Sequence, residues 1–393
     1  MEINLLLYLP DKTFIYIDDK LRKELFDDVI RTTLTNFSKK NSLKMKNLSR
    51  YKVGTRAIPK KVFLKLLKTS KIKLKTFNKK ITIKVGRRGN KVKMGPFLTI
   101  TPEWVYISEL IRGDGSLCRG NNYSYTTCFA NKNTSLINLV QNFFIKQGLN
   151  QKHIGIYNDS KDPDMKYLYA HSEIFSYLLK NFFLIPFGKK GDLFLPRFIK
   201  REPQFYISAI RGIFDAEGCI TYKREGKQNK KTLTIGMKDG IYIKDIHKAL
   251  SSLGIKSNLY QDKKKLYRLY IQSIRDITRF YRIVKPEHTK KIPVFKQIIK
   301  NCKKSKSNNS IFFKIKILKI LEKKDSKMRD VCEKRNISNS KAGNNLYLLK
   351  KEKLIEVKKA IKTNKGCWFI YSITEKGKNY LNSKISNLSL IFS

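Results

Sequence analysis

The sequence has few of the residue types that bind transition metals. Among its 393 residues are four histidines and six cysteines. The histidines form no His-x-x-x-His or Cys-His cluster, and the cysteines show neither close pairing nor zinc-ligand spacing. These absences argue against a zinc finger and against a histidine-based metal nuclease, and they indicate reduced, partly buried thiols.

Long apolar runs and a secretion signal are also absent. No apolar stretch approaches the length of a membrane span, and the segment Met1–Tyr8 lacks a cationic start and a cleavage site. We therefore expect no membrane partner and no secretion. The expected location is the cytoplasm, in association with the nucleoid, or an organellar matrix.

Acidic residues are scarce relative to basic ones. The chain has 84 Lys and Arg against 31 Asp and Glu, a formal net charge of +53 and a pI near 10.1. An AT-rich genome inflates lysine, isoleucine and asparagine, but it does not explain so unequal a ratio. The charge predicts a polyanionic partner, with nucleic acid as the first candidate and ribosome association as an alternative.

Hydrophobic residues are present in the amount that a folded protein needs. They make up 41% of the chain, and aromatic residues make up 11%. This content is enough for buried cores, and the length indicates two or three domains.

One short pattern occurs twice. Residues 105–115 read Val-Tyr-Ile-Ser-Glu-Leu-Ile-Arg-Gly-Asp-Gly, and residues 207–218 read Ile-Ser-Ala-Ile-Arg-Gly-Ile-Phe-Asp-Ala-Glu-Gly. Each predicts an apolar helix that ends in a small residue, a carboxylate (Asp114 or Glu217) and a glycine. The C-terminal end of a helix disfavours negative charge unless a cation compensates. The two tips therefore predict ligands of bound metal.

Further landmarks recur at nearly the same offset, which indicates an internal duplication of about residues 100–300. Gly148 corresponds to Gly254, and Pro196 corresponds to Pro293. Each half is predicted to contain the motif helix, a strand pair, a helix, further strands and a closing helix. The predicted strands and middle helices are Ser124 to Ala130, Thr134 to Gln147 and Lys166 to Ala170, then Thr232 to Met237, Ile243 to Leu253 and Leu266 to Ile271.

These duplicated motifs resemble the LAGLIDADG family of homing endonucleases in its single-chain, two-motif form. The resemblance covers about half the chain and is strongest over Ile210–Gly218. It implies an α+β fold with a duplicated αββαββα core that forms a pseudo-two-fold DNA-binding saddle, and a monomer. It also implies that the motif helices pack closely through Gly212, Ala216 and, in part, Gly113.

The resemblance implies a metal site as well. Asp114 and Glu217 would lie side by side below the minor groove of double-stranded DNA and share two or three Mg²⁺ ions, with Gly113 and Ala216 at the same site. Oxygen ligands select Mg²⁺. The ions would activate water and stabilise the leaving 3′ oxygen, with one phosphodiester cut on each strand.

In the family, a lysine that polarises the attacking water tends to precede an apolar-Pro step late in each half. Lys290 and Lys291 match this pattern before Ile292-Pro293. In the first half the counterpart is Lys189 or Lys190, displaced from Pro196 by five residues. Strand-selective rates or nicking could follow from this displacement.

Three residues depart from the family pattern. Glu109 stands where a small residue is preferred at the helix interface, so either the packing is looser or the acid finds a cationic partner. Glu217 replaces the usual final Asp, and Arg112 occupies the position of the first motif Asp, which the family uses structurally.

The N-terminal region, residues 1–95, predicts a small helical domain and a basic hinge. The segment Leu48–Pro59 resembles a helix-turn-helix of the phage-repressor type, in which Gly54 suits a helix end and Pro59 a helix start. The resemblance places Ser49, Arg50 and Lys52 near DNA. Residues 71–93 alternate basic and apolar residues, so parts of this hinge could form an edge hairpin.

The remaining boundaries follow from composition. Residues 96–202 and 203–300 are the two halves, and 301–309 form a polar, turn-rich linker. Residues 310–393 resemble a winged helix domain, with Asn339, Ser340, Lys341, Asn344 and Asn345 on the groove-facing helix. The saddle also implies DNA contacts by Arg119, Lys223 and Arg224 on the strands.

The leading hypothesis is a site-specific double-strand DNA endonuclease, encoded by a mobile intron or a free-standing gene. One alternative is a non-catalytic DNA-binding regulator, which joins a degenerate copy of this fold to a helix-turn-helix. Another is a maturase whose partner is intron RNA. Retention of both terminal acids argues against the regulator, whereas the sequence hardly separates endonuclease from maturase.

Overall fold

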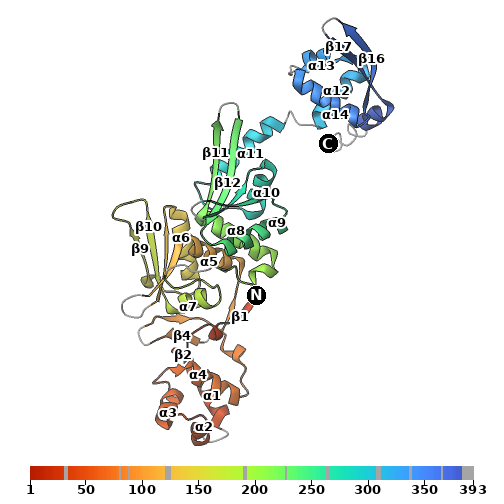
Figure 1. Cartoon of the computed structure of the whole chain (residues 1–393). Coiled ribbons are helices and arrows are strands. Elements are labelled where there is room, and N and C mark those ends of the chain that lie inside the picture. The colour runs from red at the N-terminus through yellow and green to blue at the C-terminus, as the bar shows by residue number, and fades with distance from the viewer. Residues whose placement is uncertain are drawn as a thin grey trace. The chain divides into compact units, whose positions relative to one another are not determined.

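The chain forms two compact units, Met1–Ile299 and Lys300–Ser393. Figure 1 shows the computed structural model. It describes residues 1–30, 34–78, 81–86, 89–119, 125–188, 193–225, 228–262, 266–306, 311–335, 339–363 and 366–382. The division falls one residue before the predicted end of the second half.

Within the first unit, the element order αββαββα occurs twice. The first copy contains α5 (Pro102–Asp114), β7 (Gly115–Arg119), β8 (Tyr125–Asn131), α6 (Thr134–Lys146), the 3-10 helix η3 (Gln151–His153), β9 (Ile154–Asn158), β10 (Lys166–His171) and α7 (Glu173–Asn181). The 3-10 helix η4 (Ile199–Arg201) precedes the second copy: α8 (Pro203–Glu217), β11 (Gly218–Glu225), β12 (Gln228–Met237), α9 (Gly240–Ser252), β13 (Asn258–Gln261), β14 (Tyr267–Ile271) and α10 (Ile274–Val284). The α+β fold class and the duplication are confirmed.

Each copy folds its four strands into one antiparallel sheet. The strand orders are β7-β8-β10-β9 and β11-β12-β14-β13, which are equivalent. The registers agree as well, because Phe129 pairs with Leu168 in the first sheet and Ile235 with Leu269 in the second. All four of these side chains are fully buried, so one face of each sheet packs on helices.

The two motif helices α5 and α8 pack against each other at unusually short range. A Cβ atom at Gly113 would lie 2.4 Å from Ala216 Cβ, and one at Gly212 would lie 2.6 Å from the Tyr106 carbonyl oxygen and 2.7 Å from Glu109 Cβ. Only glycine leaves room for this approach. The predicted close packing through Gly113, Gly212 and Ala216 is therefore present.

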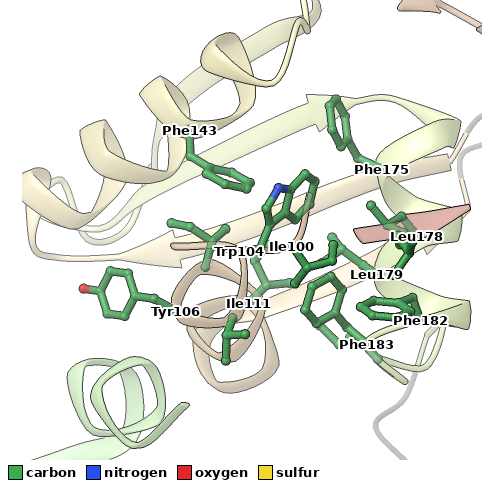
Figure 2. Close-up of a cluster of buried hydrophobic side chains, with 14 of the residues drawn as sticks. Ile100, Trp104, Tyr106, Ile111, Phe143, Phe175, Leu178, Leu179, Phe182 and Phe183 are labelled. Atoms are coloured by element: carbon green, nitrogen blue, oxygen red, sulfur yellow. The ribbon is translucent and has the colours of Figure 1, made fainter. Parts of the chain in front are cut away.

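Aromatic side chains fill the core of the first half. Trp104 on α5 is 1% exposed, and its ring centroid lies 4.6 Å from that of Phe143 and 6.0 Å from those of Phe175 and Phe183. Figure 2 shows these rings gathered on one side of α5, with Phe143 on α6, Phe175 on α7 and Phe183 just after α7. The face of α5 that carries Trp104 therefore packs into the core of the first half.

Glu109 finds a cationic partner rather than loosening the interface. Its carboxylate accepts a hydrogen bond from Arg112 Nε at 2.9 Å and another from the Tyr242 hydroxyl of α9. All three side chains are fully buried. The ion pair lies within α5, and the hydrogen bond from Tyr242 joins the two halves; a buried carboxylate requires partners of this kind.

The N-terminal region of the first unit combines helices with a small sheet. Its elements are β1 (Glu2–Asn4), the 3-10 helix η1 (Leu5–Leu7), β2 (Thr13–Ile17), α1 (Asp19–Ile30), α2 (Leu34–Lys40), α3 (Met45–Val53), β3 (Ile58–Pro59), α4 (Lys60–Thr69), the 3-10 helix η2 (Leu74–Phe77), β4 (Ile81–Val85), β5 (Lys91–Lys93) and β6 (Phe97–Thr99). Gly54 ends α3 with φ +84°, and Arg22 donates to the carbonyl oxygens of Lys52 and Val53 at that end. The predicted helix end is confirmed.

Part of the segment predicted as a basic hinge forms a sheet. Strands β4 and β5 pair antiparallel within the sheet β3-β2-β4-β5, and β5 is its edge strand. Ile81, Ile83 and Val85 are buried and alternate with more exposed residues. The expected edge hairpin is present because the apolar residues of β4 follow the period of a strand.

The C-terminal unit combines helices with a small antiparallel sheet. Its elements are α12 (Ile311–Lys323), β15 (Ser326–Lys327), α13 (Met328–Arg335), α14 (Asn339–Lys351), β16 (Ile355–Thr363) and β17 (Gly366–Ile373), with the strand order β15-β17-β16. Ile317, Leu318, Val331, Leu346 and Leu349 lie in its core. The expected helices and the two long strands are present, and DNA binding by this unit stays a prediction.

The predicted linker 301–309 is in large part helical. Helix α11 (Ile292–Lys306) continues through residues 301–306, and residues 307–309 lie outside the described residues. Residues 301–306 contain no glycine or proline, and lysine has a high helix propensity, so the polar composition does not end the helix. In the part of the chain that the structure describes, no helix has the length and apolar character needed to cross a membrane.

Replacing Gly212 by alanine tests the contact between the motif helices. The new methyl group meets backbone atoms, so we expect Gly212→Ala to lower the free energy of unfolding of the first unit by about 1–3 kcal/mol. Chemical denaturation followed by the fluorescence of buried Trp104 measures this change.

The matched control is Gly343→Ala in α14, where the nearest atom, Met328 Sδ, is 3.5 Å from the added Cβ. There the same substitution should stabilise its helix by up to about 1 kcal/mol. Equal stability of Gly212→Ala and the native chain would contradict the close packing.

Candidate functional site

The two acids of the duplicated motif end adjacent helices at the same place. Asp114 is the last residue of α5, and Glu217 is the last residue of α8. The Cβ position of Gly113 lies 3.2 Å from Glu217 Cγ as well as 2.4 Å from Ala216 Cβ. The structure therefore brings the two helix tips, and with them Asp114, Glu217, Gly113 and Ala216, into one site.

The glycine after each acid is required by close packing. Gly115 and Gly218 both have extended backbone and begin a strand. A Cβ at Gly115 would lie 2.6 Å from the Cys128 carbonyl oxygen, and one at Gly218 would lie 2.5 Å from the Phe214 carbonyl oxygen. The chain can thus pass directly from helix to sheet, which holds each acid at the rim of its sheet.

The two carboxylates have different surroundings. Asp114 is half-buried and accepts a hydrogen bond from Asn131 Nδ2 at 2.7 Å, whereas Glu217 is exposed. Asn131 is in turn held by its Oδ1 atom, which accepts from the Asn133 backbone N–H at 2.7 Å. Sequence reasoning missed Asn131, because no residue of this kind stands at the equivalent position Met237 in the second half.

Lys291 lies at the C-terminal tip of α8. Its Nζ donates to the carbonyl oxygens of Phe214 at 2.7 Å and Asp215 at 2.8 Å, near the C-terminus of α8. Burial lowers the pKa of Lys291 to about 8, although the carboxylates of Asp215, Asp114 and Glu217 act in the opposite direction. The ammonium group is therefore within electrostatic range of both terminal acids.

Of the two predicted lysines, the structure places only Lys291 in this environment. Lys290 is exposed, within the turn that leads into α11. The predicted first-half counterparts Lys189 and Lys190 lie outside the described residues. The sequence could not separate Lys290 from Lys291, because both precede the same apolar-Pro step.

Asp215 anchors the segment that carries Lys291. Its buried carboxylate accepts from the Tyr106 hydroxyl at 3.0 Å and from the backbone N–H groups of Glu287 at 2.9 Å and His288 at 3.3 Å. Burial raises the pKa of the Asp215 carboxyl, while these hydrogen bonds and the charge of Lys291 act against it. Asp215 is thus a positioning residue. The sequence indicated it only through its position, which is that of the first acid in the motif.

Arg112 has the equivalent position in the first half, but it donates hydrogen bonds where Asp215 accepts them. Its guanidinium donates to the carbonyl oxygens of Phe183 and Leu184, just after α7, as Asp215 accepts from residues just after α10. Each motif helix therefore holds the segment that follows the closing helix of its own half. One half does so with an anion and N–H donors, and the other with a cation and C=O acceptors.

Burial also affects a histidine beside Lys291. It lowers the pKa of His288 to about 4, with the positive charge of Lys291 as a second cause. The Nδ1 atom of His288 is buried and has no hydrogen-bond partner within the described residues. His288 is therefore neutral at neutral pH and adds no further positive charge to the site.

The donor set at the tips suits a hard cation only in part. Two carboxylates and main-chain carbonyls supply oxygen, the ligand atom that Mg²⁺ prefers. Within the described ranges, no group of three or more His, Cys, Asp or Glu residues could hold a metal ion. A cation at the tips would therefore need further oxygen ligands from outside the protein, such as phosphate or water.

The predicted DNA-contacting residues lie on the two sheets of the duplicated core, on α3 and on α14. Arg119 on β7 and Lys223 on β11 are exposed at the sheets, Arg50 is exposed and Lys52 half-buried on α3, and Asn344 is exposed on α14. Lys52 Nζ lies 3.9 Å from Asp27 Oδ1. The side chains of Arg224 and Lys341 lie outside the described part of the chain.

Comparison with known proteins gives one matching family model and several similar solved structures. The family model of the LAGLIDADG-like domain matches residues 204–285. Mesophilic variants of the homing endonuclease I-DmoI are 20% identical, with a TM-score of 0.36 over 48% of this chain and 98% of that chain. The LAGLIDADG meganuclease I-AabMI bound to uncleaved DNA is 11% identical, with a TM-score of 0.37 over 52% of this chain and 92% of that chain.

The range matched by the family model is the second copy of the duplicated core, from the start of α8 to the end of α10. It contains the motif Ile210–Gly218, in which the sequence resemblance is strongest. Residues 204–285 are therefore a LAGLIDADG-like domain, and the predicted resemblance of the chain to the LAGLIDADG homing endonuclease family is confirmed.

Proposed function

We propose that the chain is a site-specific double-strand DNA endonuclease of the homing type, which hydrolyses one phosphodiester on each strand across the minor groove. The observation that carries this proposal is the junction of α5 and α8. There the two helices end side by side in Asp114 and Glu217, and the ammonium group of Lys291 lies within electrostatic range of both carboxylates. The net charge of +53 supports a polyanionic substrate.

Divalent metal fits the junction as part of a complex with DNA. Asp114 and Glu217, with main-chain oxygens near Gly113 and Ala216, would hold two or three Mg²⁺ ions, and phosphate and water oxygens would supply the ligands that the protein lacks. When bound, the ions would lower the pKa of water and stabilise the leaving 3′ oxygen. Asn131 would orient Asp114 through the hydrogen bond at 2.7 Å.

Lys291 is proposed to orient the attacking water in the half that α8 carries. Asp215 fixes the preceding residues, and two carbonyl oxygens at the end of α8 hold the ammonium group. A positive group at this point also offsets the mutual repulsion of the two terminal carboxylates. Lys190 is proposed as the first-half counterpart of Lys291. Lys290 is proposed to contact the neighbouring DNA backbone.

The flanking regions are proposed to extend the DNA contact. The helices α2 and α3 would act as a helix-turn-helix, with Arg50 and Lys52 near phosphate. The C-terminal unit would act as a winged helix domain, with Lys341 and Asn344 facing a groove. Such contacts would position the chain, while the strands with Arg119, Lys223 and Arg224 would lie along the duplex.

Removing either terminal acid tests the catalytic proposal. With Mg²⁺ and DNA that carries the uninterrupted insertion site, we expect the native chain to produce a double-strand break. Asp114→Asn and Glu217→Gln should lower the cleavage rate by about 100-fold or more, because each removes a carboxylate that would hold the metal ions needed to stabilise the transition state. Gel analysis gives the rate, and a mobility-shift assay should show that binding is retained.

The matched control is Glu103→Gln at the opposite end of α5, where Glu103 forms an exposed ion pair with Lys146. Its cleavage rate should equal that of the native chain. Binding without cleavage under any divalent metal would favour a DNA-binding regulator. Tighter binding to the host intron RNA than to DNA would favour a maturase.

Replacing Lys291 tests its buried charge. Lys291→Met should lower cleavage by about 100-fold or more, whereas Lys290→Met, which removes an exposed lysine, should cleave nearly as the native chain does. The native chain should also gain stability relative to Lys291→Met as pH rises from 8 towards 10.5. In that window the folded state has lost the Lys291 proton and the unfolded state has not.

Chemical denaturation at several pH values measures this difference in the free energy of unfolding. A difference that stays constant from pH 7 to pH 10 would show that Lys291 is not desolvated, even if cleavage were lost.

A further inference from the structure

Two cysteines lie diagonally across the first two strands of the first sheet. The register of β7 and β8 pairs Ser116 with Cys128 and Cys118 with Thr126. Alternate residues of a strand point to the same face, and paired residues share a face, so these four side chains lie on one side of the sheet. The two cysteines are therefore diagonal neighbours on that side, and both are free thiols.

The side chains shorten this diagonal. The Cys118 Sγ and Ser116 Oγ atoms lie 3.3 Å apart, so the Cys118 thiol leans along β7 toward the row that contains Cys128. Burial raises the pKa of the Cys128 thiol to about 11, and the neighbouring Cys118 thiol is the second cause. Hydrogen bonds of Cys128 with Tyr169 and Ser116 act in the opposite direction. The Ser116 hydroxyl is thus next to both thiols.

The two thiols differ in their access to solvent. Cys118 is exposed, whereas Cys128 is 9% exposed. An oxidant dissolved in water therefore reaches Cys118 first, and Cys128 is the second thiol beside it. Cysteines that sense oxidants combine an accessible thiol with a neighbouring thiol that resolves its oxidised form. The arrangement on β7 and β8 has both parts of such a pair.

The second half lacks this pair. The registers of β7–β8 and β11–β12 are equivalent when the first residues of β7 and β11 are aligned. Thr221 and Thr234 then occupy the positions of Cys118 and Cys128. A hydroxyl group does not form a bond of this kind. The thiol pair is therefore a property of this chain's first half and not of the duplicated fold.

We propose that Cys118 and Cys128 form a reversible disulfide in the presence of hydrogen peroxide, and that this bond lowers cleavage by displacing Asp114. The effect on cleavage rests on the proposed function, whereas formation of the disulfide does not.

The oxidation takes place in two steps. The Cys118 thiolate attacks hydrogen peroxide, the O–O bond breaks, and Cys118 becomes a sulfenic acid while hydroxide leaves. The Cys128 sulfur then attacks Cys118 Sγ, the S–O bond breaks, and the disulfide forms while a second hydroxide leaves. The two hydroxides take up the two thiol protons. Two thiols are thus oxidised to one disulfide, and one peroxide is reduced to two waters.

Closure of this bond requires the backbone to move. Diagonal neighbours across an antiparallel strand pair have Cα atoms about 7–8 Å apart, whereas a disulfide usually spans about 4.4–6.8 Å between Cα atoms. Strand β7 must therefore slide along β8 by part of the spacing of one residue. A disulfide that closes under strain is easily reduced, which suits reversible regulation.

This slide acts on the candidate site. Strand β7 starts at Gly115, directly after Asp114, and β8 carries Asn131, whose Nδ2 donates to the Asp114 carboxylate at 2.7 Å. The register of the same two strands therefore sets this hydrogen bond. Sliding β7 along β8 moves Asp114, and a misplacement of about 1 Å in a catalytic group can cost about 100-fold in rate.

Peptide mapping tests the disulfide without DNA. The reduced full chain, freed of reductant, is treated with hydrogen peroxide, alkylated and digested with trypsin. Arg119 lies between the two cysteines, so they fall in separate peptides, residues 113–119 and 120–132. We expect these peptides to be joined within one chain and to separate in dithiothreitol. Oxidation of Cys118 to a sulfinic acid alone, or a bond between two chains on a non-reducing gel, would overturn the pair.

Single variants identify the two sulfurs. Cys118→Ser and Cys128→Ala should each abolish the bond. Because Cys118 is exposed, Cys118→Ser keeps the test decisive even where replacement of buried Cys128 destabilises the chain. The matched control is Cys367→Ser, which removes an exposed cysteine of the C-terminal unit and should form the same bond as the native chain. Loss of the bond in Cys367→Ser would contradict the assignment.

Hydrogen exchange tests the displacement of Asp114 independently of cleavage. Amide exchange in residues 113–119 should become faster in the oxidised chain, because sliding β7 breaks hydrogen bonds between β7 and β8. Dithiothreitol should reverse this change, and Cys118→Ser should show none. Unchanged exchange in the fully oxidised chain would overturn the displacement, whatever the cleavage rate.

Cleavage measures the regulatory effect. Peroxide should lower the cleavage rate of the native chain by about tenfold or more, and dithiothreitol should restore it. Cys118→Ser should cleave at the same rate before and after peroxide. Equal rates for the oxidised and reduced native chain would overturn the effect on cleavage. A reduced chain that never cleaves would contradict the proposed function, and the peptide map and the exchange rates would still decide the disulfide and the displacement.

Discussion

The close contact of α5 with α8 is the constraint on which the candidate site depends. Gly212 lets the Tyr106 carbonyl and Glu109 Cβ approach one helix, and Gly113 lets Ala216 approach the other. Because both helices are rigid and end at their acids, this approach alone fixes where Asp114 and Glu217 lie. A side chain larger than hydrogen at either glycine would separate the tips and the charges they carry.

The second constraint is the anchoring of the segment after each closing helix. Asp215 accepts backbone N–H groups in one half, and Arg112 donates to carbonyl oxygens in the other. Both halves thus hold this segment with a buried charged side chain, and the sign of that charge is opposite in the two halves. This reversal explains why Glu109 is tolerated at the helix interface, since Arg112 and Tyr242 bind its carboxylate.

Much of the core was predictable from periodicity and turn chemistry. The duplicated motif, the strand alternation and the glycines after the acids were visible as local patterns, and the structure contains the corresponding helices and strands. The distinction between Lys290 and Lys291 was not predictable, because it depends on which side chain points to the end of α8. Asn131 was not predictable either, since its contact with Asp114 crosses from β8 to α5.

The sequence by itself determined the α+β class, the duplication and the identity of the terminal acids, because these depend on residue type and on spacing along the chain. Only the tertiary structure decided which groups surround those acids. Burial of Lys291, the Asn131 amide and the anchoring roles of Asp215 and Arg112 arise from contacts between segments far apart in the chain. Burial and distance, which set pKa values and hydrogen bonds, are properties of the packed fold and not of its local pattern.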